Sequence, residues 1–271
     1  MIIDVHAHAF PESMAERAIR FLEEKTGNRV RAIGDGTLKG LVGQLAAGGI
    51  DHAVFCPIAT KPHHFEGILA ESLAIRAGER GVEAADRIIP LASVHPDDEQ
   101  RFAHLARVRE SGLKGVKLHP YYQPCVIDSE PMLEYFRCCR DLGLVVQCHC
   151  GFDIGFPFDP VCGADRVANV IRQVPGLKLI AAHLGCCFQW DLSVERLLGE
   201  DVYLDTSIIP GYETDPAVRR ILREHPAERL LFATDWPWLG YPDALRQIRA
   251  LDRPEDDIRK ILGGNAAVLF L

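Results

Sequence analysis

The chain has 271 residues, a formal net charge of −8 and an isoelectric point near 5.8. It has no block of Lys or Arg, which argues against nucleic acid or an anionic membrane as a partner, because both require a basic face. Its first residues do not show the basic stretch followed by an apolar stretch that is typical of a secretory leader. No apolar run approaches the roughly 20 residues that span a bilayer. We therefore expect a cytoplasmic protein that acts on a small molecule. Assembly into a homo-oligomer is compatible with this composition.

Eight short apolar runs rich in β-branched residues predict strands at 2–8, 50–58, 88–94, 115–119, 144–149, 177–183, 202–207 and 230–235. Between and after them, helical spacing of apolar residues predicts helices at 12–24, 38–48, 66–80, 102–108, 130–142, 164–174, 192–198, 216–225 and 243–251. Strand followed by helix, eight times, predicts an α/β fold, a (β/α)8 TIM-type barrel with residues 1–271 as a single domain. The alternative, a doubly wound open sheet, lacks the Gly-x-Gly-x-x-Gly turn after its first strand.

The first predicted strand ends in Asp4-Val5-His6-Ala7-His8. Residues i and i+2 of a strand point to the same side, so His6 and His8 can direct both imidazoles to one point. The pair by itself is compatible with a metal site and with hydrogen-bonded core histidines. Asp4 should point into the lower part of the barrel and be hydrogen-bonded there.

Side chains that can bind a metal or titrate also lie at the ends of other predicted strands. Together with the first pair they are His6 and His8, Lys117 and His119, His149, His183, and Asp235. Barrel active sites are built at the carboxyl ends of the strands, so these groups should meet at one rim. We predict that five of them surround a divalent metal, Zn²⁺ by preference, as one ion or two. The five are His6, His8, His149, His183 and Asp235.

This mixture of side chains suits hydrolysis. Imidazoles and a carboxylate hold a zinc-type ion and leave a position for water, whose pKa the ion lowers from about 16 to about 7. A carboxylate beside the ion can take the second proton and pass it to the leaving group. We assign that task to Asp235, with His183 assisting. The predicted function is a metal-dependent hydrolase of an ester, lactone or amide bond.

With these motifs the chain resembles the amidohydrolase superfamily, and within it the amidohydrolase-related family that includes the aminocarboxymuconate-semialdehyde decarboxylase-like enzymes. The motifs run from Ile-Asp-Val-His-Ala-His through Gly-Val-Lys-Leu-His-Pro and the two histidine-ended strands to Phe-Ala-Thr-Asp-Trp-Pro and Gly-Asn-Ala-Ala. The resemblance implies that the metal ligands are His6, His8, His149 and Asp235. It implies that His183 is the catalytic base or a ligand of a second ion. Lys117 would be either a carboxylated bridge between two ions or an unmodified cation for the substrate.

Two other functions compete with hydrolysis. A non-oxidative decarboxylase of a small unsaturated or aromatic carboxylate would use the same ion, but it should supply a cation for the carboxylate. The predicted rim loops carry few basic residues besides Lys61 and Lys117, which favours hydrolysis. A structural metal-binding protein without catalysis should have a closed four-ligand site, and the extra His183 and Lys117 argue against it.

Further residues on the predicted rim concern the substrate and the entrance. Lys117, His119 and Trp236 are expected to contact the substrate, and other aromatic residues that follow the strands could line a pocket or anchor loops. The segment 10–36 could cover the mouth as a lid. The nine cysteines are expected to be reduced, with Cys148 and Cys150 facing away from the side that His149 faces.

Overall fold

The computed structural model describes residues 1–81, 85–207 and 211–271. Its strands are β1 (Ile3–Ala7), β2 (His52–Phe55), β3 (Ile88–Pro90), β4 (Gly115–Leu118), β5 (Val145–Cys148), β6 (Lys178–Ala181), β7 (Tyr203–Asp205) and β8 (Leu230–Leu231). Its longer helices are α1 (Glu12–Lys25), α2 (Leu38–Gly48), α3 (Phe65–Arg76), α4 (Arg101–Glu110), α5 (Glu130–Asp141), α6 (Ala164–Gln173), α7 (Trp190–Arg196), α8 (Pro216–Glu224), α9 (Tyr241–Arg249), α10 (Glu255–Arg259) and α11 (Asn265–Phe270). The eight predicted strands are all present, each shorter than its apolar run.

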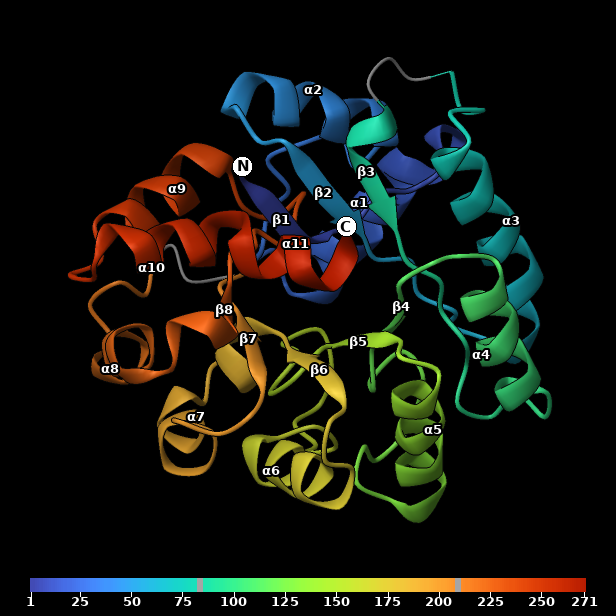
Figure 1. Ribbon diagram of the computed structural model, residues 1–271. Coiled ribbons are helices and arrows are strands. Elements are labelled where there is room, and N and C mark those ends of the chain that lie inside the picture. Colours follow the sequence, from blue (N-terminus) through green and yellow to red (C-terminus); the bar gives the residue numbers. More distant parts are fainter. Residues whose placement is uncertain (82–84, 208–210) are drawn as a thin grey trace.

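The strands form a closed barrel. Parallel ladders run in the order β1-β2-β3 and β4-β5-β6-β7-β8. A bridge between Ala92 and Val116 joins the two ladders on one side. On the other side Val5 N donates to Phe232 O at 3.0 Å, which closes β8 onto β1. The helices surround the strands, and the predicted (β/α)8 barrel is confirmed (Figure 1).

The barrel has an inner and an outer core. The inner core is filled by small and β-branched side chains, which include Ile3, Val5, Val54, Val145 and Ile180. Larger side chains, together with the buried Cys148 and Cys150, pack in the outer core between strands and helices. The two cysteines thus take the helix-facing place predicted for them, and the nine cysteines are unpaired.

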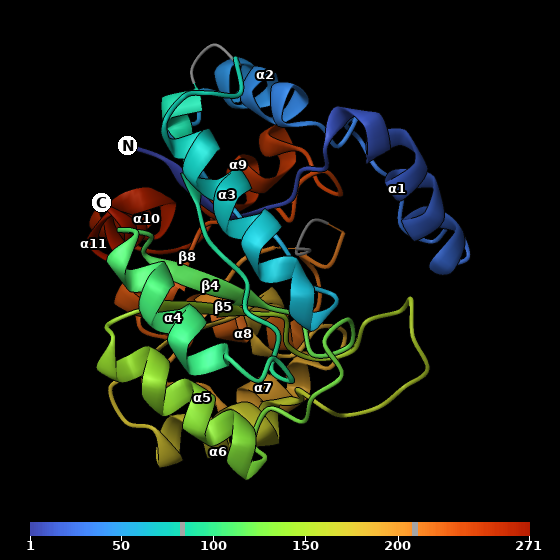
Figure 2. The ribbon, with the colours of Figure 1, turned by 90° about the vertical axis from the view of Figure 1, so that its right-hand side faces the viewer.

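The C-terminal segment closes the bottom of the barrel. Ala266, Leu269 and Phe270 of α11 join the inner core. The helices α10 and α11 were not predicted, and a wider helical turn at Lys260–Gly264 joins them. At Gly263 a Cβ atom would lie 2.5 Å from Met1 O, so this close approach requires glycine. Both chain ends lie at this end of the molecule, and α1 projects at the opposite end (Figure 2).

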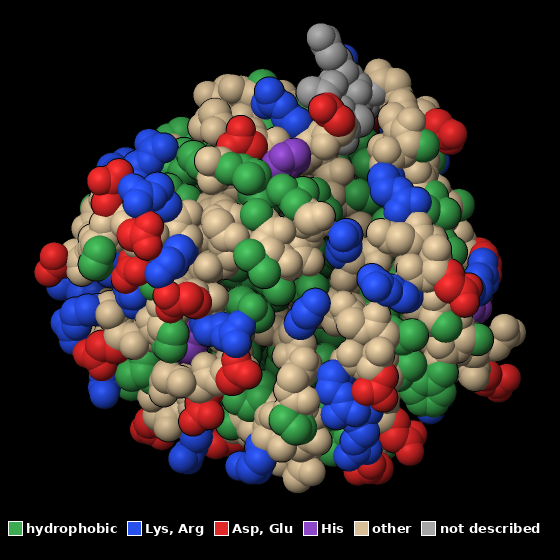
Figure 3. All heavy atoms as spheres, viewed as in Figure 1, with side chains coloured by type: hydrophobic (Ala, Val, Ile, Leu, Met, Phe, Trp, Pro, Cys, Tyr) green, Lys and Arg blue, Asp and Glu red, His purple; other side chains and the backbone are tan. Residues whose placement is uncertain are grey.

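The face that carries α10 and α11 shows Lys and Arg interspersed with Asp and Glu (Figure 3). Ion pairs such as Arg259–Asp256 and Lys260–Glu228 contribute to this pattern. Within the described ranges, no helix has both the length and the apolarity to cross a bilayer.

His225 lies at the end of α8, far from the predicted site residues, and gives the fold a pH dependence. Its Nδ1 accepts a hydrogen bond from Gly199 N at 3.3 Å, and its Nε2 donates to Val202 O at 3.1 Å. Burial lowers the pKa of His225 to about 4, so the folded state holds the neutral ring. The unfolded chain binds a proton near pH 6.5, and the folded chain does not until about pH 4. The stability that depends on neutral His225 is therefore complete above pH 6.5 and is lost as the pH falls towards 4.

We expect protonation of His225 to lower the free energy of unfolding by on the order of 2–3 kcal/mol between pH 7 and pH 4. Urea unfolding across this range should show a shallower acid dependence in His225→Gln than in the parent protein. His52→Gln, at the start of β2, serves as the control and should keep the parental slope. Equal slopes in all three proteins would contradict the role of His225.

Candidate active site

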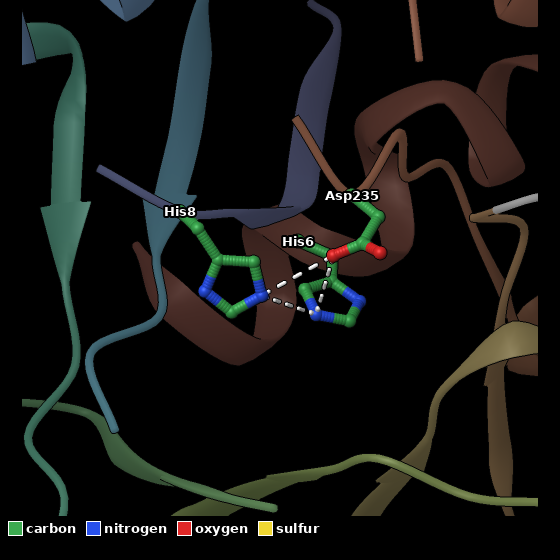
Figure 4. Close-up of side chains that lie close together, drawn as sticks. All are labelled: His6, His8 and Asp235. Atoms are coloured by element: carbon green, nitrogen blue, oxygen red, sulfur yellow. Dashed lines mark hydrogen bonds and ion pairs between the residues drawn. The ribbon is translucent and has the colours of Figure 1, made fainter. Parts of the chain in front are cut away.

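Three predicted site residues meet at the carboxyl end of the barrel. His6 and His8 lie at the end of β1, and Asp235 follows β8, where its backbone N donates to His6 O at 2.9 Å. His6 Nε2 lies 3.2 Å from His8 Nε2. Asp235 Oδ1 lies 3.3 Å from His6 Nε2 and 3.2 Å from His8 Nε2 (Figure 4). Closure of the barrel between its first and last strands therefore creates this group.

The three donors fit a divalent metal ion. Donors about 2.1 Å from one tetrahedral ion stand about 3.4 Å apart, close to the observed spacing. The remaining ring nitrogens are already engaged, because His6 Nδ1 donates to Asp205 Oδ2 at 3.0 Å and His8 Nδ1 donates to Cys56 O at 2.8 Å. With its Nδ1 proton held in this way, each ring carries a lone pair on Nε2, the nitrogen that faces the other donors. Such hydrogen bonds to the far nitrogen are a regular feature of metal-binding histidines.

Electrostatics keep the group ready to donate electron pairs. Burial, with a contribution from nearby Lys117, lowers the pKa of His6 to about 4, so its ring is neutral near pH 7. Burial by itself would raise the pKa of Asp235, whereas protonation of His6 or His8 would hold it well below its usual range. The structure thus combines two imidazoles with one ionised carboxylate.

Asp205, at the end of β7, organises this site, although no role is predicted for it from the sequence. Its Oδ2 accepts hydrogen bonds from His6 Nδ1 and from Gln147 Nε2, the latter at 2.6 Å. Its Oδ1 accepts from His183 N at 2.8 Å and from Ser207 Oγ at 2.5 Å. The strand-end rule that singled out the other residues also applies to Asp205, so the signal was present in the sequence.

His183 belongs to a chain of hydrogen bonds that starts at Asp205. Since Ser207 Oγ donates to Asp205, it accepts from His183 Nδ1 at 2.7 Å. Burial lowers the pKa of His183, and the lone pair on Nε2 of the neutral ring faces His149 Nδ1 at 3.0 Å. His149 Nδ1 therefore donates, and the buried lone pair of His149 Nε2 has no hydrogen-bond partner among the residues that the structure describes.

His149 lies beside the first three donors in the same cavity, but its closest neighbours are different. Its ring stacks on His119, with centroids 4.2 Å apart and an angle of 12° between the planes. His119 Nε2 lies 3.5 Å from Asp153 Oδ2, and these three residues form a second group of potential donors. Two nearly parallel stacked rings cannot both direct a nitrogen in their own planes at one ion. The second group is therefore a poor metal site in this arrangement, while His149 Nε2 is free for another partner.

Two residues expected to contact substrate lie beneath the cavity wall instead. Trp236 is fully buried against Gly34, where a Cβ atom would lie 2.7 Å from its ring, and it does not line the cavity. Lys117 is also fully buried, and its Nζ donates to His6 Nε2 at 2.7 Å. The sequence places both at strand ends, but the direction of each side chain depends on packing. His119 does line the cavity.

A cavity of about 770 Å³ opens above the donors and is lined by His6, His8, His119, His149, His183 and Asp235. Its outer wall includes Met14, Leu22 and Lys25 of α1, so the predicted lid segment does contribute to the enclosure. Predicted aromatic residues that line it are Tyr122, Phe152 and Trp238. Lys61 is exposed and does not line it.

Backbone strain is concentrated among the site residues. His183 has φ 58° and Asp235 has φ 59°, a left-handed conformation that is uncommon outside glycine. Each such residue costs about 1–3 kcal/mol and persists only where its surroundings fix it. Here the fixing bonds are His183 N to Asp205 and Asp235 N to His6 O. Strain of this kind accumulates at functional sites.

His149→Ala is expected to lower the bound metal and abolish turnover, because it removes an unpartnered nitrogen that lines the cavity. Metal analysis of the purified variant tests this. His225→Ala should cost stability through its two lost hydrogen bonds, yet keep the metal content and turnover of the folded protein. Unchanged metal in His149→Ala would remove that residue from the ligand set.

Comparison with known proteins gives a match over nearly the whole chain. A family model described as amidohydrolase matches residues 3–271. The fold is similar to an uncharacterised TIM-barrel protein of Bordetella bronchiseptica, with a TM-score of 0.74, 18% identity, and coverage of 99% of this chain and 97% of that one.

Two further solved structures have the same fold. One is a dihydroxybenzoic acid decarboxylase from a Polaromonas species with bound manganese, with a TM-score of 0.72, 18% identity, and coverage of 99% of this chain and 96% of that one. The other is a probable 2-pyrone-4,6-dicarboxylic acid hydrolase of Acinetobacter baumannii, with a TM-score of 0.65, 17% identity, and coverage of 99% and 98%. A comparison with curated protein sequences gives no match.

Proposed function

The chain belongs to the amidohydrolase family, and from this premise we propose that it is a metal-dependent hydrolase of an ester, lactone or amide bond in a small molecule. The observation that carries the proposal is the convergence of His6 Nε2, His8 Nε2 and Asp235 Oδ1 at 3.2–3.3 Å, with the far nitrogen of each ring already engaged. We propose His149 as a fourth ligand and His183 as a ligand of a second ion or a proton carrier. Zinc is the proposed metal.

A bound divalent ion would supply two effects, the acidification of a water molecule and the polarisation of a carbonyl oxygen. The cavity above the donors leaves room for water and substrate, which supports catalysis over a purely structural metal site. Apolar side chains such as Phe152 and Ile154 line the walls and would limit the access of bulk water to a bound substrate.

The protein's own residues provide a route for protons. Asp235 lies at the floor of the cavity, where its carboxylate can accept a proton from the attacking water and return it to the leaving group. His183 Nε2 accepts a hydrogen bond from His149 Nδ1 at the cavity wall, and the Nδ1 proton of His183 is held by Ser207 and, through it, by Asp205. Asp205 therefore fixes the orientation of both His6 and His183.

A second candidate function, non-oxidative decarboxylation, is favoured by one specific observation. Lys25 of α1 lines the cavity and supplies the cation that the predicted rim loops lacked. The dihydroxybenzoic acid decarboxylase described above has a fold similar to that of this chain. The donor set serves either reaction, so the product must distinguish them.

Elemental analysis of the purified protein followed by a substrate screen tests the proposal. Lactones, amides and aromatic carboxylates would be supplied to the metal-loaded protein, with acid production and carbon dioxide release followed separately. We expect close to stoichiometric zinc and acid production without carbon dioxide. Carbon dioxide release would favour the decarboxylase, and a protein without bound divalent metal would contradict both.

The position of Lys117 bears on the number of ions. Its ammonium occupies the lone pair of His6 Nε2, which a bound cation would need. A carboxylated Lys117 would remove this competition and could bridge two ions. Intact-protein mass spectrometry under native conditions would detect the added mass of one carbon dioxide, and its absence would support a single ion.

A further inference from the structure

We propose that Lys25 recognises an anionic group of the substrate, so that this cavity takes an apolar molecule that carries a carboxylate. The inference rests on the proposed function, because it names the substrate class for the same cavity. Lys25 lies in the last turn of α1, and among the described residues that line the cavity it is the only Lys or Arg.

Aromatic rings hold the Lys25 ammonium in the cavity wall. Its Nζ lies 3.3 Å from the ring centroid of Phe156 and 4.5 Å from that of Tyr122. Cation–π contacts of this kind fix a cation without consuming its hydrogen-bond donors. Across the described ranges Lys25 forms no ion pair and no side-chain hydrogen bond, so its N–H groups are available to an acceptor in the cavity.

The nearest competitor for these donors is Asp153, whose carboxylate is already engaged. Its Oδ1 accepts from Gly155 N at 2.8 Å, and its Oδ2 lies 3.5 Å from His119 Nε2. The wall around Lys25 is otherwise largely apolar, with Met14 and Leu22 on the same helix. A carboxylate that reaches Lys25 would therefore form a charge-assisted hydrogen bond beside this wall, and such bonds are stronger than those between neutral groups.

The same wall offers apolar contacts to the rest of the ligand. Tyr122 contacts both the Lys25 ammonium and the ring of His119, and Phe152 and Ile154 line the same cavity. A planar or branched apolar body can lie against them while its carboxylate meets Lys25. This arrangement requires only that α1 keep its place, which a hydrogen bond from Arg29 Nη2 to Ile154 O at 3.2 Å supports.

A pair of probes that differ only in charge tests the proposal by direct binding. Isothermal titration calorimetry would compare 1-naphthylacetate with 1-naphthylacetamide on the purified full chain, with its metal and again after chelation. The variants are Lys25→Met, Lys25→Arg and, as a matched control, Lys61→Met on the exposed loop after β2. We expect the parent protein to bind the carboxylate more tightly, and Lys25→Met to weaken it about tenfold or more while changing the amide less than about twofold. Lys25→Arg should retain most of the preference, and Lys61→Met all of it.

Three results would overturn the proposal. Equal losses for both probes in Lys25→Met would show that the residue only shapes the wall. A carboxylate preference that disappears on chelation and ignores Lys25→Met would assign recognition to the metal, and no preference in the parent protein would exclude anion recognition. Because no turnover is measured, failure of the hydrolase proposal leaves this test intact, and the reverse also holds.

Discussion

Asp235→Asn is expected to lower turnover by about 10²–10⁴-fold, the usual contribution of a positioned acid–base group. The substitution keeps the size of the side chain but removes its negative charge from a site where Oδ1 lies within 3.3 Å of both His6 Nε2 and His8 Nε2. Bound metal should fall as well, because a neutral amide is a weaker ligand than a carboxylate. Metal analysis and steady-state kinetics on the substrate found by the screen measure both effects.

Asp153→Asn is the matched control for Asp235→Asn, since Asp153 is the other Asp that lines the described part of the cavity. It lies outside the group formed by His6, His8 and Asp235, so its variant should keep the parental metal content. If Asp235→Asn kept full metal and full turnover, the proposed centre would be wrong. If it lowered only the unfolding temperature, Asp235 would be a structural residue.

Asp205→Asn is expected to weaken metal binding by about 10–100-fold without removing any residue that faces the cavity. Its carboxylate holds His6 Nδ1, the backbone of His183 and Ser207 Oγ in one network. Burial by itself would raise the pKa of Asp205, but His6, His183 and Ser207 hold it well below its usual range. The loss of this charge should loosen the orientation of His6. Competition with a chromogenic chelator measures the affinity, and excess metal should restore part of the turnover.

The control for Asp205→Asn is a second buried aspartate that binds a histidine ring. Asp98 Oδ2 accepts from His104 Nδ1 at 2.7 Å beside α4, outside the barrel. Asp98→Asn should therefore lower stability and leave the metal affinity unchanged. If the two variants affected metal affinity equally, the effect of Asp205 would be one on folding rather than on ligand orientation.

The sequence predicted the barrel because alternating strands and helices are encoded in the spacing of neighbouring apolar residues. The strand runs ending at His8, His149 and His183 were recognised in this way, although each strand is shorter than its apolar run. The same spacing placed His6 and His8 on one side of β1, and the strand-end rule brought in Asp235. For these residues, position along a strand was enough to indicate position in the site.

Other features depended on how distant elements pack. Lys117 lies near the end of a predicted strand and Trp236 follows one. Trp236 is nevertheless buried against Gly34 and Lys117 beneath His6, because the direction of a side chain is set by the space that its neighbours leave. Lys25 enters the cavity only because α1 packs beside the loop that carries Phe156.

The sequence by itself therefore determined the barrel and the side chains at its rim, since both follow from periodicity and strand ends. The tertiary structure decided which ring nitrogen is free, how Asp205 connects β1 with β6, and where a cation meets the cavity. These relations join residues up to about two hundred positions apart, His6 and Asp205 among them. Contacts at that separation are fixed by barrel closure and loop packing, which local spacing does not encode.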